Sequence, residues 1–474
     1  MKLESITIQN FKGIRRKAVI PLAPVTMLFG ANSSGKSSIL HAFLYLYELL
    51  VNKNADPEYS TVTGEHVYLG GFSELVNGKE LSKNITLGVA FNLEPSMDFY
   101  NTFMTDSDSS VCEGHISNVS APVVHYALEM DIGFSELENR AFVKQSRVSI
   151  NHQLFCSLSA VAGKKSVTIE VIQPSGLYVI ADSENDGVLP FLDVGFFELN
   201  LPYKALLNAD ERVGLEDAPL EWDLICSEKP LAGRIITECA FADIVLAPLR
   251  HFSKRLQQLI HIGPLRVIPN RSFVAKRSPD KPRWFNGEVG WDAFTFGSSL
   301  LQQEVNGWYK NHFNCPYQFL KSPYGYGVAL ADANSAMPLL PSQVGAGVSQ
   351  IFPFVVAAVK PDVCMISIEQ PELHLHPAWQ VELADLMLTQ TNQYRANKLF
   401  LVETHSEHMV LRLLKRIRDS QDSTLPLESN LAQIIFCEVF EGETRIRPIG
   451  ITPDGDFDTA WPNGFFEERG KELF

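Results

Sequence analysis

A glycine-rich stretch between two apolar runs constrains this chain most: Gly30-Ala-Asn-Ser-Ser-Gly-Lys-Ser-Ser38. Residues 24–29 before it read as a buried strand, and residues 39–46 after it read as an apolar helix. The spacing Gly, four residues, Gly-Lys-Ser in this context predicts a loop whose backbone N–H groups surround a phosphate at a helix N-terminus. The residues expected to bind a nucleotide here are Gly30, Asn32, Ser33, Gly35, Lys36, Ser37 and Ser38.

Two side chains of this stretch point to a nucleoside triphosphate. Lys36 supplies a full positive charge, and the Ser37 hydroxyl is placed to reach a magnesium ion that bridges the terminal phosphates. The expected cofactors are therefore ATP and Mg²⁺. The alternative is a glycine-rich turn that only caps a helix.

The composition is that of a large globular protein. At 474 residues the chain exceeds the usual size of one hydrophobic core, so two lobes or two domains are expected. The net charge of -15 opposes binding of nucleic acid by the whole surface, and any such contact must be local. Seven cysteines without a C-x-x-C pair, no signal peptide and no membrane-spanning apolar run predict a cytoplasmic protein with no membrane contact.

The apolar pattern predicts an α/β fold with an antiparallel part. Short strands are expected at residues 4–9 and 17–21, and an antiparallel meander at 85–91, 123–128, 146–150, 166–172 and 177–180. Residues 101–110 read as a polar loop, and residues 184–330 as helices and loops without heptads. After residue 340 we expect helices at 351–358 and 377–388, strands at 363–368 and 398–402, and a hairpin at 434–440 and 444–448.

One segment of this acidic chain is basic. Residues 250–283 hold nine lysines and arginines, with Asp280 as the acid among them: Arg250, Lys254, Arg255, Arg266, Arg271, Lys276, Arg277, Lys281 and Arg283. A solvated helix and loop explains such a segment, and so does a surface for nucleic acid or a partner.

Polar residues at the ends of later strands complement the phosphate loop. Glu369 ends one buried strand, where a carboxylate can hold Mg²⁺, and His405 follows the next. Because ligands gather at the carboxyl ends of parallel strands, we expect Gly30, Glu369 and His405 at one edge of the sheet. The stretch 344–350 offers a second glycine-rich helix start, with Gly345, Gly347 and Ser349 as expected nucleotide contacts. A second cradle suggests that it serves the nucleotide of a neighbouring subunit.

At these residues the sequence resembles the ABC-type ATPase heads shared by chromosome-maintenance, recombination-repair and OLD-like proteins. The residues that carry the resemblance are Asn10–Lys12 as the N-terminal nucleotide-contacting turn, Gly30–Ser38 as Walker A, Val344–Gln350 as a divergent signature motif, Ile366–Gln370 as Walker B, Leu373–Pro377 as the D-loop and His405 as the switch histidine. The resemblance implies that Lys12 contacts nucleotide, that Glu369 and Ser37 hold the metal, and that ATP joins two heads.

A narrower similarity is to bacterial stand-alone ATPases that end in a domain of unknown function, some of them in phage-defence operons. It rests on His261–Arg266, Glu369–Pro377 and the tail Trp461–Phe466. We accordingly expect an N-terminal ATPase lobe with Walker A and the antiparallel meander at residues 1–183. A mainly helical and loop insertion with the basic segment would follow at 184–340, and a C-terminal ATPase lobe at 341–474.

Gln370 departs from the wider pattern, in which a second acid follows the Walker B residue. An amide can orient water but cannot accept its proton. Hydrolysis is then slow, with Gln370 only positioning water; or Glu372 or His405 acts as the base; or Gln370 is a trapping substitution for a native acid. The narrower similarity favours the first.

Two functional classes fit this reading. The favoured one is a nucleotide-gated switch or sensor in which an ATP-bound dimer controls a separately encoded effector, as in anti-phage defence. The alternative is a DNA-associated ATPase motor or clamp in repair or recombination, with nucleic acid bound through residues 250–283. A transition-metal site built from the nearby histidines and an intrinsic nuclease are less well supported.

Overall fold

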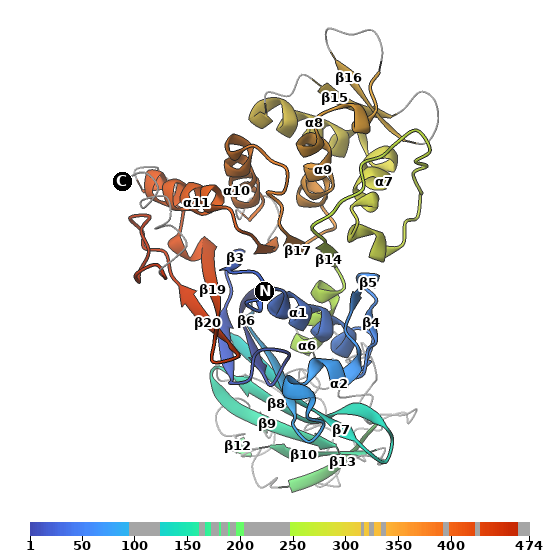
Figure 1. Ribbon diagram of the computed structural model, residues 1–474. Coiled ribbons are helices and arrows are strands. Elements are labelled where there is room, and N and C mark those ends of the chain that lie inside the picture. The colour runs from blue at the N-terminus through green and yellow to red at the C-terminus, as the bar shows by residue number, and fades with distance from the viewer. Residues whose placement is uncertain are drawn as a thin grey trace. The chain divides into compact units, whose positions relative to one another are not determined.

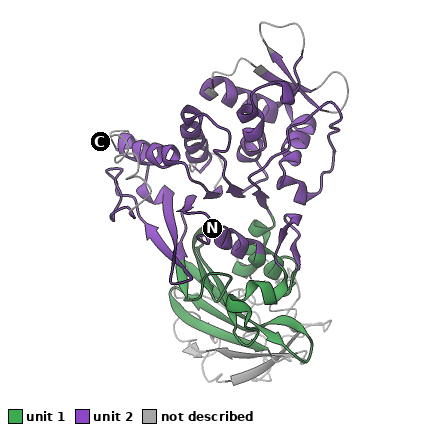
Figure 2. Ribbon diagram, viewed as in Figure 1, with its two compact units in different colours: residues 1–19, 45–57, 70–257 green, residues 20–44, 58–69, 258–474 purple. Residues whose placement is uncertain are grey.

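The structure is a computed structural model, and it describes residues 1–93, 124–160, 166–171, 180–181, 188–189, 196–202, 247–313, 317–321, 327–332, 338–391, 398–421 and 427–462. The chain divides into two compact units that alternate along the sequence (Figure 2). Unit 1 holds residues 1–19, 45–57 and 70–257, and unit 2 holds residues 20–44, 58–69 and 258–474. The predicted boundary after residue 183 lies outside the described residues, so the three-part division stays a prediction.

Unit 1 is built on an eight-stranded sheet in the order β13-β10-β9-β8-β7-β6-β1-β2 (Figure 1). The strands are β1 Lys2–Gln9, β2 Ala18–Pro21, β6 Ile85–Asn92, β7 His125–Ser135, β8 Arg140–Ile150, β9 Gln153–Ala160, β10 Ser166–Val171 and β13 Phe196–Pro202. Strands β6 to β10 pair antiparallel with their neighbours in sequence, which confirms this part of the predicted meander. The expected last strand at 177–180 does not join it, because Ile180 begins a short strand of a separate two-stranded sheet, and residues 177–179 lie outside the described residues. The sequence pattern missed β9 and β13, and residues 101–110 lie outside the described residues. The expectation of helices and loops throughout residues 184–330 is therefore wrong, because this range holds β13 and further strands that belong to unit 2.

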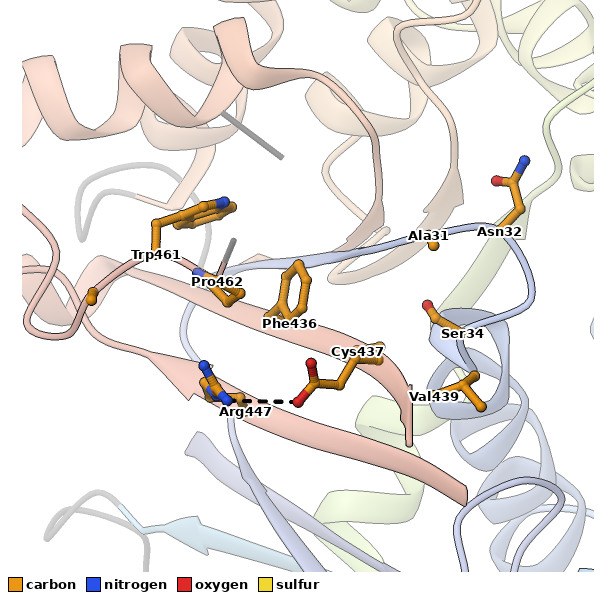
Figure 3. Close-up of a pocket in the computed structure, with 11 residues that line it drawn as sticks. Ala31, Asn32, Ser34, Phe436, Cys437, Val439, Arg447, Trp461 and Pro462 are labelled. Carbon is orange, nitrogen blue, oxygen red and sulfur yellow. Dashed lines mark ion pairs between the residues drawn. The ribbon is translucent and has the colours of Figure 1, made fainter. Parts of the chain in front are cut away.

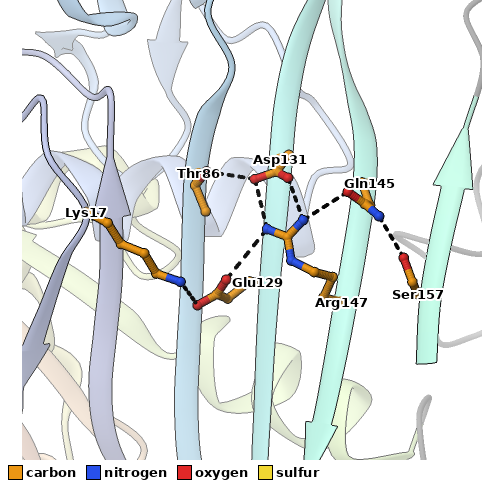
Figure 4. A network of polar contacts seen from close by, with 7 residues as sticks. All are labelled: Lys17, Thr86, Glu129, Asp131, Gln145, Arg147 and Ser157. Carbon is orange, nitrogen blue, oxygen red and sulfur yellow. Dashed lines mark hydrogen bonds and ion pairs between the residues drawn. The ribbon is translucent and has the colours of Figure 1, made fainter. Parts of the chain in front are cut away.

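The two faces of this meander differ in polarity. Buried apolar residues such as Tyr126 and Met130 alternate along β7 with polar ones. On the polar face, Arg147 Nη1 donates to Asp131 Oδ2 at 2.7 Å and Thr86 Oγ1 donates to Asp131 Oδ1 at 2.7 Å (Figure 4). The network thus joins β6, β7 and β8 across the face that does not form the core.

The part of unit 1 that the structure describes holds several further elements. They are α2 Gly71–Leu75, the 3-10 turn Asn77–Lys79, α6 Ala247–Leu256 and the paired strands β11 Ile180–Ala181 and β12 Val188–Leu189. The small hairpin of β4 Tyr59–Ser60 and β5 Gly64–Tyr68 belongs to unit 2. Tyr45, in the part of helix α1 (Lys36–Leu50) that belongs to unit 1, stacks on Phe11 at 6.1 Å between ring centroids.

Unit 2 contains the six-stranded sheet that carries the phosphate loop. Its order is β14-β17-β18-β3-β19-β20, from β3 Val25–Gly30, β14 Leu259–Ile262, β17 Met365–Glu369, β18 Leu399–Glu403, β19 Ala432–Phe440 and β20 Glu443–Ile449. The first five strands are parallel and β20 is antiparallel to β19. This mixed core sheet, with the antiparallel sheet of unit 1, confirms the predicted fold class.

Helices pack on this sheet in one apolar core, and Figure 1 shows α9 beside α10. The helices are α7 Glu288–Phe296, α8 Ser299–Phe313, α9 Ala346–Val359, α10 Pro377–Thr391 and α11 Glu407–Ser420, with a hairpin of β15 Tyr317–Lys321 and β16 Val328–Asp332. Helix α1 Lys36–Leu50, which follows the phosphate loop, is divided between the two units after Leu44. From Gly347 to Val359 every residue of α9 is buried, as expected for a helix that is apolar on all sides. No helix among the described residues is long and apolar enough to cross a membrane.

The pH dependence of stability should report on Lys398, a buried lysine at the start of β18. Its ammonium donates to the carbonyls of Lys360 at 2.6 Å and Ala357 at 3.5 Å, which closes the C-terminal end of α9. Burial lowers the pKa of Lys398 to about 8. Between that pH and the usual lysine pKa the unfolded chain binds more protons, so the free energy of unfolding rises with pH.

The Lys398→Met variant removes this proton linkage. We expect its free energy of unfolding, measured by urea titration from pH 8 to 10, to rise less steeply with pH than that of the wild type. The largest difference in slope is about 1.4 kcal/mol per pH unit. Equal slopes for the two proteins would show that Lys398 keeps its ordinary pKa in the fold.

Candidate nucleotide site

The loop between β3 and α1 has a backbone that only glycine can supply at two positions. Gly30 has φ +143° and Gly35 has φ +99°. A Cβ atom would lie 2.1 Å from the carbonyl oxygen of Cys437 at Gly30, and 2.5 Å from Thr444 Oγ1 at Gly35. Strands β19 and β20 therefore pack against both glycines, and a side chain at either position would clash. Glycines at these two positions are what a phosphate-binding loop needs.

Lys36 is buried within this loop. It is 3% exposed, and its ammonium donates to the carbonyl oxygens of Gly30 at 3.0 Å and Ala31 at 2.8 Å. Asn32 and Ser33 lie at the exposed tip, whereas Ser38 is half-buried in the first turn of α1. Ser34, which the sequence analysis did not single out, is 1% exposed, and its Oγ has no hydrogen-bond partner among the described residues. A buried hydroxyl left in this state inside the loop fits a missing polar ligand.

Two carboxylates lie next to each other at the carboxyl end of the sheet. Glu369 of β17 pairs in register with Glu403 of β18. Glu403 accepts a hydrogen bond from Ser37 Oγ at 2.8 Å, and its other oxygen lies 3.8 Å from Lys36 Nζ. Glu369 lies 3.1 Å from Nε2 of His261, a fully buried residue at the end of β14. The sequence analysis named Glu369 but missed Glu403 and His261 as parts of this cluster.

The charges of this cluster depend on one another. Burial and the neighbouring charge of Glu369 raise the pKa of Glu403, against the hydrogen bond from Ser37 and the charge of Lys36. Burial and the charge of Lys36 lower the pKa of His405, so its ring is neutral at pH 7. The expected convergence of Gly30, Glu369 and His405 on one edge agrees with the position of the strand ends. Carboxylate and hydroxyl oxygens are ligands that Mg²⁺ prefers, so the donor set suits that ion.

Gln370 forms a tight turn just after β17. Its φ is +44°, and its N–H donates to the carbonyl oxygen of Glu403 at 2.7 Å. Arg266 Nη2 donates to the carbonyl oxygens of Glu369 at 2.6 Å and Gln370 at 3.2 Å. Burial lowers the pKa of Arg266 to about 10, and the residue is 3% exposed. The turn at Gln370 is therefore held by hydrogen bonds to the last residue of β18 and from the Arg266 side chain.

Glu372 and His405, the other candidate catalytic residues, lie together. Glu372 Oε1 accepts a hydrogen bond from the backbone N–H of His405 at 2.7 Å. Burial raises the pKa of Glu372, and this hydrogen bond opposes the shift. Glu372 Oε2 and His405 Nε2 are buried without a hydrogen-bond partner among the described residues. Both atoms are available to a polar ligand at this edge.

The second glycine-rich stretch begins α9, and its three expected contacts differ in their surroundings. A Cβ at Gly347 would lie 2.7 Å from the carbonyl oxygen of His374, so packing alone requires that glycine. Gly345 is exposed, and a Cβ there would meet nothing within 4 Å. Ser349 is fully buried and donates to the carbonyl oxygen of Pro341 at 2.8 Å. The Ser349 hydroxyl thus already has a hydrogen-bond partner within the chain. Gly345, by contrast, is exposed and open to a ligand.

The basic segment is divided between the two units, and some of its cations are buried or paired. Residues 250–257 belong to unit 1 and residues 258–283 to unit 2. Arg266 is buried, and Arg283 forms ion pairs with Glu288 at 2.5 Å and Asp292 at 2.7 Å. Arg271, Lys276 and Arg277 remain exposed. Counting charges along the sequence therefore overstated the cationic surface of this segment.

Lys12 lies in unit 1, in a turn with φ +47°. Its N–H donates to the carbonyl oxygen of Leu75 at 2.7 Å, and Asn77 Nδ2 donates to the Lys12 carbonyl at 2.7 Å. Burial lowers the pKa of Lys12 to about 8.

His374 and His376 are exposed, and among the described residues no group of three or more His, Cys, Asp or Glu is placed to hold a metal.

A cavity of about 710 Å³ borders the loop on the side of β19 and β20 (Figure 3). Its lining includes Asn32 and Ser34 from the loop, Phe436 and Arg447 from the hairpin, and Trp461 from the tail. The Trp461 ring packs on those of Phe29 at 5.9 Å and Phe436 at 6.3 Å. Trp461 and Pro462, the first two residues of the tail motif, thus form part of the wall of the cavity beside the phosphate loop.

Comparison with known proteins gives two family matches. Residues 1–153 match the model of an "AAA ATPase domain", and residues 240–410 match that of "AAA domain, putative AbiEii toxin, Type IV TA system". The first match contains the phosphate loop, and the second contains Glu369, Gln370 and His405. No curated protein matches the chain.

Three of the solved structures that match this chain are heads of SMC proteins. The SMC head domain from Thermotoga maritima is 8% identical, with a TM-score of 0.40 over 95% of this chain and 100% of that chain. The Smc head domain with an extended coiled coil from Pyrococcus furiosus is 13% identical, with a TM-score of 0.39 over 100% and 98%. An Smc head bound to the C-winged helix domain of ScpA is 12% identical, with a TM-score of 0.41 over 95% and 98%.

Proposed function

Because the chain is an ABC-type ATPase head, we propose that it binds ATP with Mg²⁺ at the Gly30–Ser38 loop and works as a slow, nucleotide-gated switch. In the ATP-bound form two copies associate, and this association controls a separately encoded effector. The following contacts support each part of the proposal.

The nucleotide part rests on the cluster of Lys36, Ser37 and Glu403. The Lys36 ammonium donates hydrogen bonds to two loop carbonyls. A triphosphate bound in the loop would offer this ammonium charged acceptors, which form stronger hydrogen bonds. The Ser34 hydroxyl and the loop N–H groups complete the cradle. Ser37 and a carboxylate at this edge of the sheet, Glu369 in the sequence pattern, would hold Mg²⁺, which supplies positive charge to the oxygens of the terminal phosphates.

Slow hydrolysis follows from the residues around the Gln370 turn. The Gln370 amide can orient a water molecule but cannot accept its proton. Glu372 and His405 are the nearby groups that could do so, and the N–H of His405 already holds one oxygen of Glu372. Hydrolysis that depends on a water positioned by an amide suits a switch whose bound state has to persist.

The single observation that carries the association of two copies is the contrast between Gly345 and Gly347. Gly347 is required by contact with the His374 carbonyl, but nothing within the described chain requires a glycine at position 345. Gly345 and Ala346 are exposed at the start of α9, so an anion outside this chain can approach the N-terminus of the helix there. A terminal phosphate bound to the loop of a second copy is that anion in the proposal.

Control of an effector, including a role in phage defence, is supported by the sequence similarity of Glu369–Pro377 and Trp461–Phe466 to ATPases of defence operons. The test is whether the product of a neighbouring gene co-purifies with the protein in ATP and separates from it without nucleotide. The alternative, a DNA motor or clamp, would use the exposed Arg271, Lys276 and Arg277. It requires ATPase that DNA stimulates and that falls steeply with salt.

ATP with Mg²⁺ is expected to convert the wild-type protein from monomer to dimer, measured by size exclusion with light scattering. The Gly345→Asp variant should bind ATP as tightly as the wild type and stay monomeric, because its carboxylate repels the phosphate of the second copy. Space around Gly345 is open and its φ of -54° is ordinary, so the fold should lose no more than about 0.5 kcal/mol.

The matched control is Ser342→Asp, which places the same charge on the exposed turn just before α9. This variant should still dimerise in ATP. Dimerisation of Gly345→Asp at the wild-type ATP concentration would contradict the proposed role of the second loop, and a wild type that never associates in ATP would contradict the switch.

A further inference from the structure

The two neighbouring carboxylates, Glu369 and Glu403, are held in different ways. Glu369 is engaged from the side of β14, because its Oε1 lies 3.1 Å from His261 Nε2. That histidine is fixed in turn, with its Nδ1 2.9 Å from Ser367 Oγ. Glu369, His261 and Ser367 are therefore linked by polar contacts between β14 and β17.

Glu403 is engaged from the side of the phosphate loop. One of its oxygens accepts the hydrogen bond from Ser37 at 2.8 Å, and the other lies 3.8 Å from the Lys36 ammonium. The side chain is only 10% exposed. A buried carboxylate that touches both functional side chains of the loop lies where the phosphates and their counter-ion have to bind.

The Ser37 hydroxyl can serve both partners at once. Its single hydrogen is donated to Glu403, and the oxygen keeps lone pairs for a metal ion. Two adjacent carboxylates, one buried at Glu403 and one half-buried at Glu369, also need positive charge beyond Lys36, since neighbouring like charges are costly. A hard divalent cation with oxygen ligands meets that need.

We propose that Glu403 is the carboxylate that faces the magnesium ion of the bound nucleotide, together with Ser37, while Glu369 with His261 supports it from behind. The inference rests on the proposed ATP binding and refines it, because the sequence pattern assigns the metal to Glu369. Glu403 thus acts as a magnesium-binding residue contributed by the strand between Walker B and the phosphate loop.

The test compares ATP affinity with Mg²⁺ and with EDTA by isothermal titration calorimetry. Glu403→Gln is expected to weaken Mg²⁺-ATP binding by ~10-fold or more. In EDTA the same variant should bind ATP more tightly than the wild type, because a carboxylate next to the phosphates repels them. Glu369→Gln is the matched control and should change the ratio of the two affinities less than Glu403→Gln.

Electron paramagnetic resonance of Mn²⁺ with ATP gives a readout independent of turnover. The wild type should hold one Mn²⁺ per bound ATP, and Glu403→Gln should hold Mn²⁺ more weakly. Glu403→Asp keeps the charge and should recover part of the Mg²⁺ dependence, which also guards against a variant that fails to fold.

The outcomes separate the two proposals. If the wild type binds Mg²⁺-ATP and Glu403→Gln keeps the same Mg²⁺ dependence, the assignment of Glu403 is wrong while ATP binding stands. The assignment is equally wrong if Glu369→Gln alone carries the loss. A wild type that binds no ATP under either condition overturns the proposed function itself.

Discussion

The Lys36→Met variant is expected to lose most of its affinity for ATP while keeping its fold. Lys36 is the buried cation of the loop, and its charged hydrogen bonds to phosphate would be worth about 1.5–3 kcal/mol. That loss corresponds to a drop in affinity of roughly 10- to 150-fold. Methionine keeps the apolar stem of the side chain, so the packing around β3 and α1 should be retained.

Thermal unfolding with and without Mg²⁺-ATP measures this effect. At a concentration of 100 times its dissociation constant, ATP stabilises the wild type by about 2.7 kcal/mol, and a 100-fold weaker variant gains only about 0.4 kcal/mol. The unfolding temperature of Lys36→Met should therefore hardly respond to ATP.

Lys398→Met is the matched control for this experiment. Lys398 is also a buried lysine that donates to two backbone carbonyls in unit 2, but it lies at the start of β18 rather than at its end. Its replacement should lower stability without changing the response to ATP. If Lys36→Met responded to ATP as the wild type does, the loop would not be the nucleotide site.

Replacement of Arg266 by methionine should give the largest loss of stability. The guanidinium satisfies the carbonyls of Glu369 and Gln370, and Gln350 holds the Arg266 backbone through both its N–H at 3.2 Å and its carbonyl at 2.6 Å. Removing the donor leaves buried carbonyls unsatisfied, at a cost of about 2–3 kcal/mol. The Gln370 turn, with its positive φ, should then lose its fixed geometry.

Urea unfolding and steady-state ATPase, measured together, separate stability from positioning. Arg283→Met removes another largely buried arginine of the same stretch, and it leaves the buried Asp292 without its ion-pair partner, with the hydrogen bond from the Lys276 N–H retained. Both variants should unfold at lower urea, but only Arg266→Met should also lower turnover at saturating ATP. Equal turnover in the two variants would show that Arg266 supports the fold and not the catalytic turn.

Local sequence patterns predicted most elements of this fold, because those patterns depend on neighbours in the chain. The apolar runs on either side of Gly30–Ser38 became β3 and α1, and the alternating segments became β6 to β8. The predicted strands at residues 363–368 and 398–402 are β17 and β18, shifted by one or two residues. By contrast, no strand was expected in residues 184–330, and the four-residue strand β14 is too short to show a period.

A count of charged residues along the sequence could not show which cations of the basic segment are buried. Arg266 and Arg271 look alike in the basic segment, yet one is buried against the Gln370 turn and the other is exposed. The difference arises because β14 joins the edge of the core sheet beside β17, which carries the following residues inward. That pairing brings together residues about a hundred positions apart, such as His261 and Glu369, 108 positions apart.

By itself, the sequence determined the phosphate loop, its flanking strand and helix, and the candidates Lys36, Ser37, Glu369, Gln370 and His405. These follow from spacing within short stretches, and local backbone geometry enforces them. Only the tertiary structure decided that Glu403 touches Ser37, 366 residues away, and that Gly345 is open while Gly347 is packed. Such contacts are set by the register of parallel strands whose order in the sheet differs from their order in the chain.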